Sequence, residues 1–368
     1  MFQFVFIVNN ELKYAMIVAT NNQIYPVGAF MKRLNFLVFG TIFSVIFTLC
    51  LSTQLAFATS NDENTTLRNN DSLTQSKTAP TIPPTIQDPK NTEDPAGYWT
   101  KEKMKNAIPA DKIKNDEKKE TNPEQFESSL IGEPTNISDP VLPETNNSIN
   151  EANVVVPSTA GKVFFSYGGK DYVCSASSIN NNYKNLVITA AHCVNGGKGK
   201  GWHSNIAFAP AYRNGSTPYG IWNWKEARTF NAWINDSNSS YDQAFFTVFP
   251  RNEKDLVNTI GGNGLSTGYG TNQPDVRIFG WPAENPYDGQ IAYYCDGPTT
   301  SRGWFSSDAT MKCGMNGGAS GGPWLRERIN QDLGYVFAVT SRRSTSGTPT
   351  LYATPNSKDV KTMFDQMK

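Results

Sequence analysis

The pattern of hydrophobic and polar positions changes near Asn153. From there to the C-terminus, short apolar runs rich in aromatic residues alternate with turn-forming clusters such as Asn195-Gly196-Gly197 and Asn214-Gly215. Many short strands separated by turn residues are typical of an all-β protein. The pattern therefore predicts an all-β domain over residues 153–368.

The end of the chain follows a different period. Val360, Met363, Phe364 and Met367 recur at helical spacing after a capping candidate at Asn356-Ser357. Such spacing places apolar side chains on one face of a helix. We predict a C-terminal helix that packs on the strands.

The N-terminal region carries a targeting pattern. Met31-Lys32-Arg33 begins a positively charged segment, which is followed by the apolar residues 37–51 and the small-x-small motif Ala56-Phe57-Ala58. This arrangement predicts a signal peptide over residues 31–58, with translation starting at Met31 and residues 1–30 as a mis-annotated upstream extension. An uncleaved signal anchor is the alternative, because the apolar run is close to bilayer length.

Residues 59–152 are of low complexity, rich in Asn, Thr, Pro, Glu and Lys. A segment of this composition buries too little apolar surface to offset its ordering entropy, so we expect a largely disordered prosegment or linker. Acidic residues predominate here and basic residues predominate in residues 153–368. Opposite charge favours a prosegment lying on its own domain; a solvated linker that touches nothing is the alternative.

Candidate catalytic chemistry centres on one of the two histidines. His192 lies upstream of Ser320, which sits in the glycine-rich run 318–323. A serine hydroxyl is a poor nucleophile unless an imidazole takes its proton, and that imidazole needs a carboxylate to orient it. Asp242 fits this role best, because it stands where a polar loop gives way to the apolar run 244–248.

The glycines beside Ser320 have their own function. An oxyanion hole needs two backbone N–H groups that point into one small space, and glycine allows the required backbone angles. We predict that Gly318 and Ser320 provide these donors. The histidine, aspartate, serine and oxyanion donors together indicate a serine hydrolase.

From about Gly161 to the C-terminus the chain resembles the chymotrypsin-fold serine peptidases, particularly the bacterial and fungal branch typified by glutamyl endopeptidases. The segments that carry the resemblance are residues 187–194, 241–245, 280–282 and 313–324. The resemblance implies two six-stranded antiparallel β-barrels with the active site between them. It places His192 and Asp242 on the first barrel and Ser320 on the second.

Residues 97–107 resemble the short helix in prosegments of bacterial relatives; a chance amphipathic stretch in a cell-wall spacer is the alternative.

Cysteine use is consistent with export. Cys50 leaves with the signal peptide, and the remaining four cysteines allow three pairings. The family resemblance selects Cys174 with Cys193 and Cys295 with Cys313. A metal site is disfavoured, because the sequence has no CxxC pair and only one spare histidine, His203. We interpret His203 as a surface or packing residue, and we expect neither a metal nor a cofactor.

The resemblance also locates the primary specificity pocket. Its walls align to Gly314, Met315, Asn316, Thr340, Ser341, Arg342 and Arg343. Gly314 replaces the trypsin-type aspartate, which disfavours cleavage after Lys or Arg because a buried cation needs a counter-charge. Thr340 replaces the histidine of glutamyl endopeptidases. The two arginines either attract an acidic side chain or are simply solvated. Ala319 replaces the aspartate of the trypsin activation switch.

We therefore predict a secreted serine endopeptidase that acts through an acyl-enzyme on protein or peptide substrates. We expect a monomer in the extracellular space or at the cell wall, without stable membrane association after signal cleavage. The sequence carries no dense basic stripe of the kind that indicates nucleic-acid binding. The mature enzyme is expected to begin between about residues 131 and 161. The alternative is a catalytically inactive relative that serves as an adhesive module, with residues 59–152 as its stalk.

Overall fold

The computed structural model describes residues 3–9, 13–20, 23–26, 73–80, 97–113, 132–144, 157–303 and 306–367. The chain divides into two compact units, Met1–Arg68 and Asn69–Lys368. The first unit contains an antiparallel sheet of three strands, β1 (Gln3–Asn9), β2 (Lys13–Thr20) and β3 (Gln23–Pro26). The expected signal peptide at residues 31–58 lies outside the described residues.

The first half of the second unit is a closed barrel of six antiparallel strands. The strands follow the order β10-β7-β8-β9-β12-β11, and pairing of β10 with β11 closes the ring. Their bounds are β7 (Ala160–Tyr167), β8 (Lys170–Ile179), β9 (Leu186–Thr189), β10 (Ser204–Pro210), β11 (Trp222–Phe230) and β12 (Ala244–Val248). Large aromatic side chains, among them Phe208 and Phe246, fill the interior. The first predicted barrel is confirmed.

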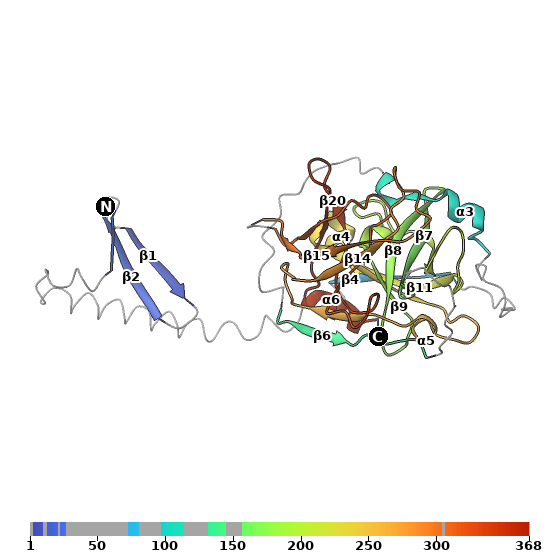
Figure 1. The fold of residues 1–368 in the computed structure, drawn as a ribbon, viewed down its shortest axis with the longest axis horizontal. Helices are drawn as coiled ribbons and strands as arrows, with labels where there is room; N and C mark the ends of the chain where they lie inside the picture. The colour runs from blue at the N-terminus through green and yellow to red at the C-terminus, as the bar shows by residue number, and fades with distance from the viewer. Residues whose placement is uncertain are drawn as a thin grey trace, which may run out of the picture. The chain divides into compact units, whose positions relative to one another are not determined.

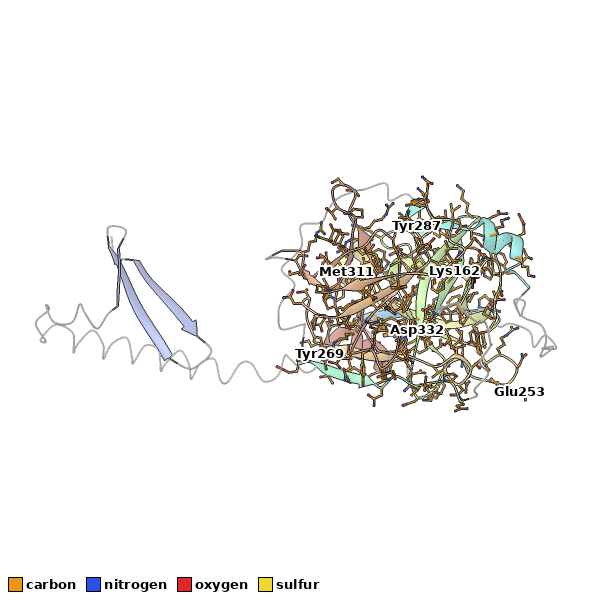
Figure 2. The ribbon with its side chains drawn as sticks, viewed as in Figure 1. Lys162, Glu253, Tyr269, Tyr287, Met311 and Asp332 are labelled. Carbon is orange, nitrogen blue, oxygen red and sulfur yellow. A yellow bond between two sulfur atoms is a disulfide. The ribbon has the colours of Figure 1, made fainter. Side chains whose placement is uncertain are left out.

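The second half is built from two sheets. One has the order β15-β14-β18-β19-β13-β6 and the other β16-β17-β21-β20. Their bounds are β6 (Thr135–Ser138), β13 (Gly264–Thr267), β14 (Val276–Gly280), β15 (Tyr293–Gly297), β16 (Thr300–Ser301), β17 (Ala309–Lys312), β18 (Pro323–Arg326), β19 (Tyr335–Val339), β20 (Arg342–Arg343) and β21 (Thr350–Ala353). Met311, which is labelled in Figure 2, and Trp324 belong to a core cluster within this half. The all-β class is confirmed, with this half divided between two sheets.

Short helices complete the unit. They are α4 (Asn231–Asp236), α5 (Leu256–Ile260) and α6 (Lys358–Asp365) (Figure 1). The Ser357 hydroxyl accepts a hydrogen bond from the Asp359 N–H at 3.2 Å and caps α6, whose apolar side chains are buried. This confirms the predicted C-terminal helix. In the part of the chain that the structure describes, no helix combines the length and apolar character needed to cross a bilayer.

Both predicted disulfides are formed. Cys174 of β8 is bonded to Cys193, and Cys295 of β15 is bonded to Cys313. The first bond ties the wall of the closed barrel to the loop that carries His192. The second joins β15 to the segment that leads to Ser320. The two bonds therefore brace the loops that carry His192 and Ser320.

Three stretches of the low-complexity segment pack on the barrels. β4 (Thr74–Thr78) pairs with β11. α3 (Lys101–Asn106) is followed by β5 (Ile108–Pro109), which pairs with β8. β6 pairs with β13. The expectation of disorder is wrong for these stretches. Trp99 and Met104 are each 2% exposed and belong to the core cluster that includes Phe164 and Val173 of the closed barrel. The helix expected within residues 97–107 is α3.

Candidate active site

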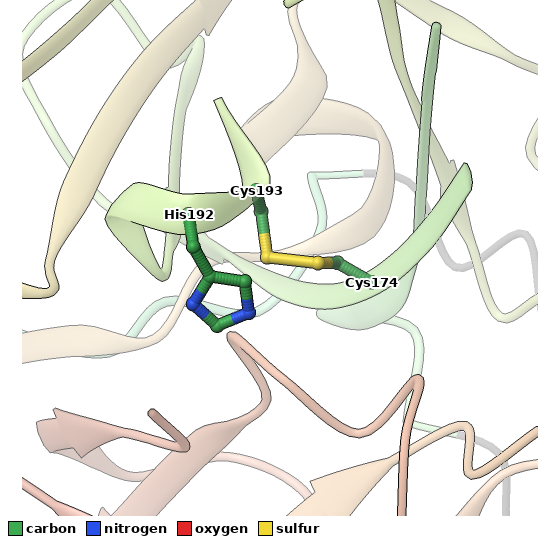
Figure 3. Close-up of side chains that lie close together, drawn as sticks. All are labelled: Cys174, His192 and Cys193. Atoms are coloured by element: carbon green, nitrogen blue, oxygen red, sulfur yellow. A yellow bond between two sulfur atoms is a disulfide. The ribbon is translucent and has the colours of Figure 1, made fainter. Parts of the chain in front are cut away.

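His192 lies in a short 3₁₀ turn (Ala191–Cys193) at the end of β9. Figure 3 shows its ring beside the disulfide that joins Cys174 to Cys193. The ring nitrogens and the two sulfurs are close enough for a metal site by distance alone. The sulfurs, however, are bonded to each other, so neither can act as a thiolate ligand. The arrangement therefore serves to hold the histidine loop.

Asp242 lies at the start of β12, where the turn Ser239–Tyr241 ends. Its carboxylate is 4% exposed and forms a hydrogen bond with His192 Nδ1, at 2.9 Å from Oδ2. Its other oxygen accepts the backbone N–H of His192, also at 2.9 Å. The Ser341 hydroxyl donates to Oδ2 at 2.5 Å. Three donors thus fix the carboxylate, and the carboxylate fixes the orientation of the imidazole.

The interaction between His192 and Asp242 shifts the pKa of both groups. Burial alone lowers the pKa of His192, but the charge and hydrogen bond of Asp242, together with the charge of Asp111, raise that pKa above its ordinary value of 6.5. Burial alone raises the pKa of Asp242, but His192 and the Ser341 hydroxyl lower it overall. The carboxylate is therefore ionised at neutral pH, and it stabilises an imidazolium. Both features suit a general base that receives a proton during reaction.

Ser320 is buried on the loop that precedes β18, and Ser175 of β8 clamps this loop to the closed barrel. The Ser175 N–H donates to the Ser320 carbonyl at 2.7 Å, and the Ser175 hydroxyl donates to the Gly318 carbonyl at 2.9 Å. The Ser320 carbonyl also lies 3.8 Å from the sulfur of Cys193. Ser320 is thus held next to the histidine loop by contacts between the two halves.

The backbone of the serine loop requires glycine at two positions. Gly318 has φ +99°, and a Cβ there would lie 2.6 Å from the Trp281 carbonyl. Gly321 has φ +80°, and a Cβ there would lie 2.1 Å from the hydroxyl of Thr189. Within the described residues, the N–H groups of Gly318 and Ser320 donate to no protein acceptor. Neither amide is engaged by a protein acceptor there, and their role as oxyanion donors stays a prediction.

A buried lysine contacts a segment that packs against the serine loop. Lys162 of β7 is 1% exposed and donates from Nζ to the Gly289 carbonyl at 3.0 Å (Figure 2). Its amine lies over the ring of Tyr212, 4.6 Å from the centroid. Gly289 packs on Ala283, whose N–H donates to the Gly317 carbonyl at 2.6 Å. Lys162 thereby helps to position the segment on which the oxyanion glycines rest.

The aligned specificity residues of the later strand make unequal contacts. Ser341 orients Asp242, as described above, and the buried Thr340 accepts the indole N–H of Trp324 at 2.9 Å. Arg342 pairs with the buried carboxylate of Asp308 at 2.5 Å. Arg343 is more exposed, and it pairs with Glu284 at 2.5 Å. Of these residues, Arg343 has its charged group least enclosed.

The aligned residues before Ser320 lie around the same loop. Gly314 is exposed, Met315 is buried in the core of the second half, and the Asn316 amide donates to the Glu284 carbonyl at 2.7 Å. These contacts describe their surroundings; the assignment of a primary pocket to them stays a prediction. His203 is a packing residue, stacked on Phe165, with Nε2–H donating to the His192 carbonyl.

Three functional contacts were missed from the sequence. Ser175 is one of three serines in the buried half of β8, and serines in such a strand need internal partners, which was a usable signal. The bond from Ser341 to Asp242 joins residues far apart in the chain, and no local pattern reveals it. The third contact reaches Ser320 itself: its hydroxyl donates to Asp111 Oδ1 at 3.2 Å. Among the described residues, no hydrogen bond joins Ser320 to His192.

A closed six-stranded β-barrel, followed by a second β half that carries a serine in a glycine-rich loop, defines a two-part serine protease architecture. No protein-family model matches this chain, and no curated protein matches it in sequence. Solved structures do. The protease Anisep from Arthrobacter nicotinovorans matches with a TM-score of 0.54 and 32% identity, over 58% of this chain and 96% of that one. The thermostable serine protease AL20 from an extremophilic microorganism matches with a TM-score of 0.53 and 28% identity, over 57% of this chain and 97% of that one. The chain belongs to the bacterial chymotrypsin-fold serine proteases.

Proposed function

We propose that residues 153–368 form a secreted serine endopeptidase with His192, Asp242 and Ser320 as its catalytic triad. The observation that carries this proposal is the hydrogen-bonded pair of His192 and Asp242 on one barrel, joined through Ser175 to the loop of Ser320. The similarity to two solved proteases supports a hydrolase that acts on proteins. The two disulfides agree with an oxidising, extracellular location.

The proposed reaction follows from the roles of these groups. Ser320 Oγ attacks the scissile carbonyl carbon while His192 Nε2 takes the hydroxyl proton, and the N–H groups of Gly318 and Ser320 stabilise the oxyanion. The imidazolium then protonates the leaving amine, and the carbon–nitrogen bond breaks to leave an ester on Ser320. Water, deprotonated by His192, cleaves this ester and releases the carboxylate product. Asp242 holds the imidazole in the required tautomer throughout.

The pH dependence of hydrolysis tests the role assigned to His192. The base must be neutral, and its pKa is raised above 6.5, so kcat/KM is expected to rise with pH through a midpoint above 6.5. Asp242, whose charge and hydrogen bond are the main causes of the raised pKa, remains beside His192 in the mature enzyme. The measurement uses an unstructured protein substrate between pH 5 and 9. Full activity at pH 5, without an acidic limb, would contradict a histidine base.

Substrate preference follows less directly from the site. We propose that the enzyme does not favour Lys or Arg before the scissile bond, because Gly314 supplies no carboxylate at the pocket base. A mixed peptide library digested by the mature enzyme, with the cut sites identified by mass spectrometry, measures this preference. The expected result is little cleavage after Lys or Arg. Dominant cleavage there would show that the pocket is aligned wrongly.

A further inference from the structure

Residues 98–113, here called the strap, run across the candidate active site. The strap contains α3, β5 and the 3₁₀ turn Ala110–Lys112, and α3 lies at the rim of the unit (Figure 1). It comes from the segment that composition alone assigns to a linker. Because a linker need not touch the catalytic residues, each contact of the strap with the site calls for an explanation.

The first part of the strap is anchored on the closed barrel. The Trp99 ring lies 5.2 Å from the ring of Phe164, and its indole N–H donates to the Asn205 carbonyl at 2.7 Å. The Tyr98 hydroxyl donates to Asp171 at 2.8 Å. With Met104 also buried, these contacts fix the strap against β7, β8 and β10 by packing and by hydrogen bonds. The anchor lies outside the catalytic residues and holds the next part in register.

The middle of the strap pairs with the first part of β8 and lies against the serine loop. In β5, Ile108 is aligned with Tyr172 and Pro109 with Val173, parallel to β8. A Cβ on Gly317 would lie 3.1 Å from the Cβ of Pro109. Gly317 directly precedes Gly318, so Pro109 lies beside the backbone that forms the predicted oxyanion hole. A substrate chain that used this edge would meet the strap.

The end of the strap places a carboxylate on the nucleophile. Asp111 accepts the hydrogen bond of the Ser320 hydroxyl at 3.2 Å, and its second oxygen lies 3.7 Å from Nε of Arg343. The next residue, Lys112, pairs with Glu284 at 2.5 Å, and Glu284 in turn pairs with Arg343. Two acidic and two basic side chains therefore alternate across the strap and the second half.

This contact has a chemical consequence. The Ser320 proton points to Asp111 and not to His192, so the hydroxyl is not set up for activation. A carboxylate anion is a poor electrophile, so Ser320 cannot use it as a substrate. The negative charge of Asp111 also adds to the charge of Asp242 near His192. The strap thus occupies the site without presenting a peptide bond to the nucleophile at this contact.

We propose that the strap is an autoinhibitory plug, in which Asp111 captures the Ser320 hydroxyl until the strap is removed by cleavage. This proposal rests on the proposed function, since it names the regulation of the same site. It also explains how the prosegment controls an enzyme in which Ala319 replaces the aspartate of the trypsin activation switch. A cut at the expected mature N-terminus, between about residues 131 and 161, separates the strap from the protease domain.

The test is the rate at which phenylmethanesulfonyl fluoride labels the uncut chain. The wild-type chain is compared with Asp111→Ala, with the isosteric Asp111→Asn, and with the wild-type chain after limited proteolysis that removes the strap. Gel electrophoresis shows that the uncut samples remain uncut during labelling. Glu102→Ala is the matched control, because Glu102 is an exposed carboxylate on α3 that contacts Asn106 within the strap.

The uncut wild-type chain and the Glu102→Ala variant are expected to label slowly. Asp111→Ala is expected to label about 10- to 100-fold faster, the range for losing a hydrogen bond to a charged group, and the cleaved chain at least as fast. Equal rates for the uncut and cleaved wild-type chains would overturn the proposal. Slow labelling of Asp111→Ala beside fast labelling of the cleaved chain would overturn the role of Asp111. No labelling of any form, the cleaved chain included, would instead overturn the proposed function and the inhibition with it.

A peptide added in trans provides a second readout. A synthetic peptide of residues 96–114 is expected to inhibit the cleaved enzyme competitively, and the same peptide with Asp111→Ala is expected to bind about 10- to 100-fold more weakly. Because the substitution is in the peptide and the same enzyme is used with both peptides, misfolding of the enzyme cannot produce this difference. Equal inhibition by the two peptides would contradict capture of Ser320 by the carboxylate.

Discussion

Replacing Ser320 with alanine is expected to lower hydrolysis by the mature enzyme by roughly four to six orders of magnitude. The substitution removes the nucleophile, and the volume changes by a single oxygen. The oxyanion donors and the His192–Asp242 pair remain, so a small residual rate over the uncatalysed reaction is expected. The measurement is kcat/KM on an unstructured protein or peptide substrate, with circular dichroism as the check on folding.

The matched control is Ser301→Ala. Ser301 lies exposed on β16 in the second half, and among the described residues its hydroxyl hydrogen-bonds to the backbone of Gly303 alone. This variant is expected to retain the activity of the wild type. Ser320→Ala protein that is folded and still hydrolyses at the wild-type rate would show that the nucleophile is another residue.

Replacing Asp242 with asparagine is expected to lower kcat by about four orders of magnitude, the size of effect found when a serine protease triad loses this charge. The carboxylate receives three donors, from the His192 ring, the His192 backbone and the Ser341 hydroxyl. An amide offers one acceptor oxygen and brings two N–H groups of its own. The His192 ring would therefore adopt the wrong tautomer, and the imidazolium would lose its counter-charge.

Asp236→Asn serves as the comparison for this variant, because Asp236 is exposed at the end of α4. It is expected to leave both kcat and the midpoint of thermal unfolding unchanged. Asp242→Asn is expected to lower the midpoint as well, since it disturbs a buried hydrogen-bond network. An Asp242→Asn enzyme with normal kcat would remove Asp242 from the proposed triad.

The sequence predicted the all-β class and the C-terminal helix because their patterns are local, whereas the six-stranded barrel was implied by the family resemblance. Apolar runs between turn clusters became β7 to β12, and the helical spacing of Val360 and Met363 became α6. The division of the second half into two sheets was not predictable in this way. Pairings such as β13 with β19 join strands about 70 residues apart, and they depend on how the whole half packs. The disulfides were assigned through the family resemblance, not through spacing.

The strap shows why composition failed for part of residues 59–152. A polar, low-complexity segment has too few apolar residues for a core of its own. Trp99 and Met104 nevertheless enter a core that the neighbouring barrel already provides, and β5 completes an existing sheet edge. Whether the segment is ordered depends on the apolar surface that it buries against the neighbouring barrel. The composition of the segment alone does not reveal that surface. The same limit applies to Ser341, whose partner Asp242 is brought near by the meeting of the two halves.

The most direct test of the central claim is the mass of the mature enzyme after reaction with phenylmethanesulfonyl fluoride. The account predicts one adduct per chain, located by peptide mapping on Ser320, with complete loss of hydrolysis in the same sample. Labelling is expected to disappear in Ser320→Ala. An active enzyme that takes up no adduct, or an inactivating adduct on a residue other than Ser320, would contradict the assignment of this site.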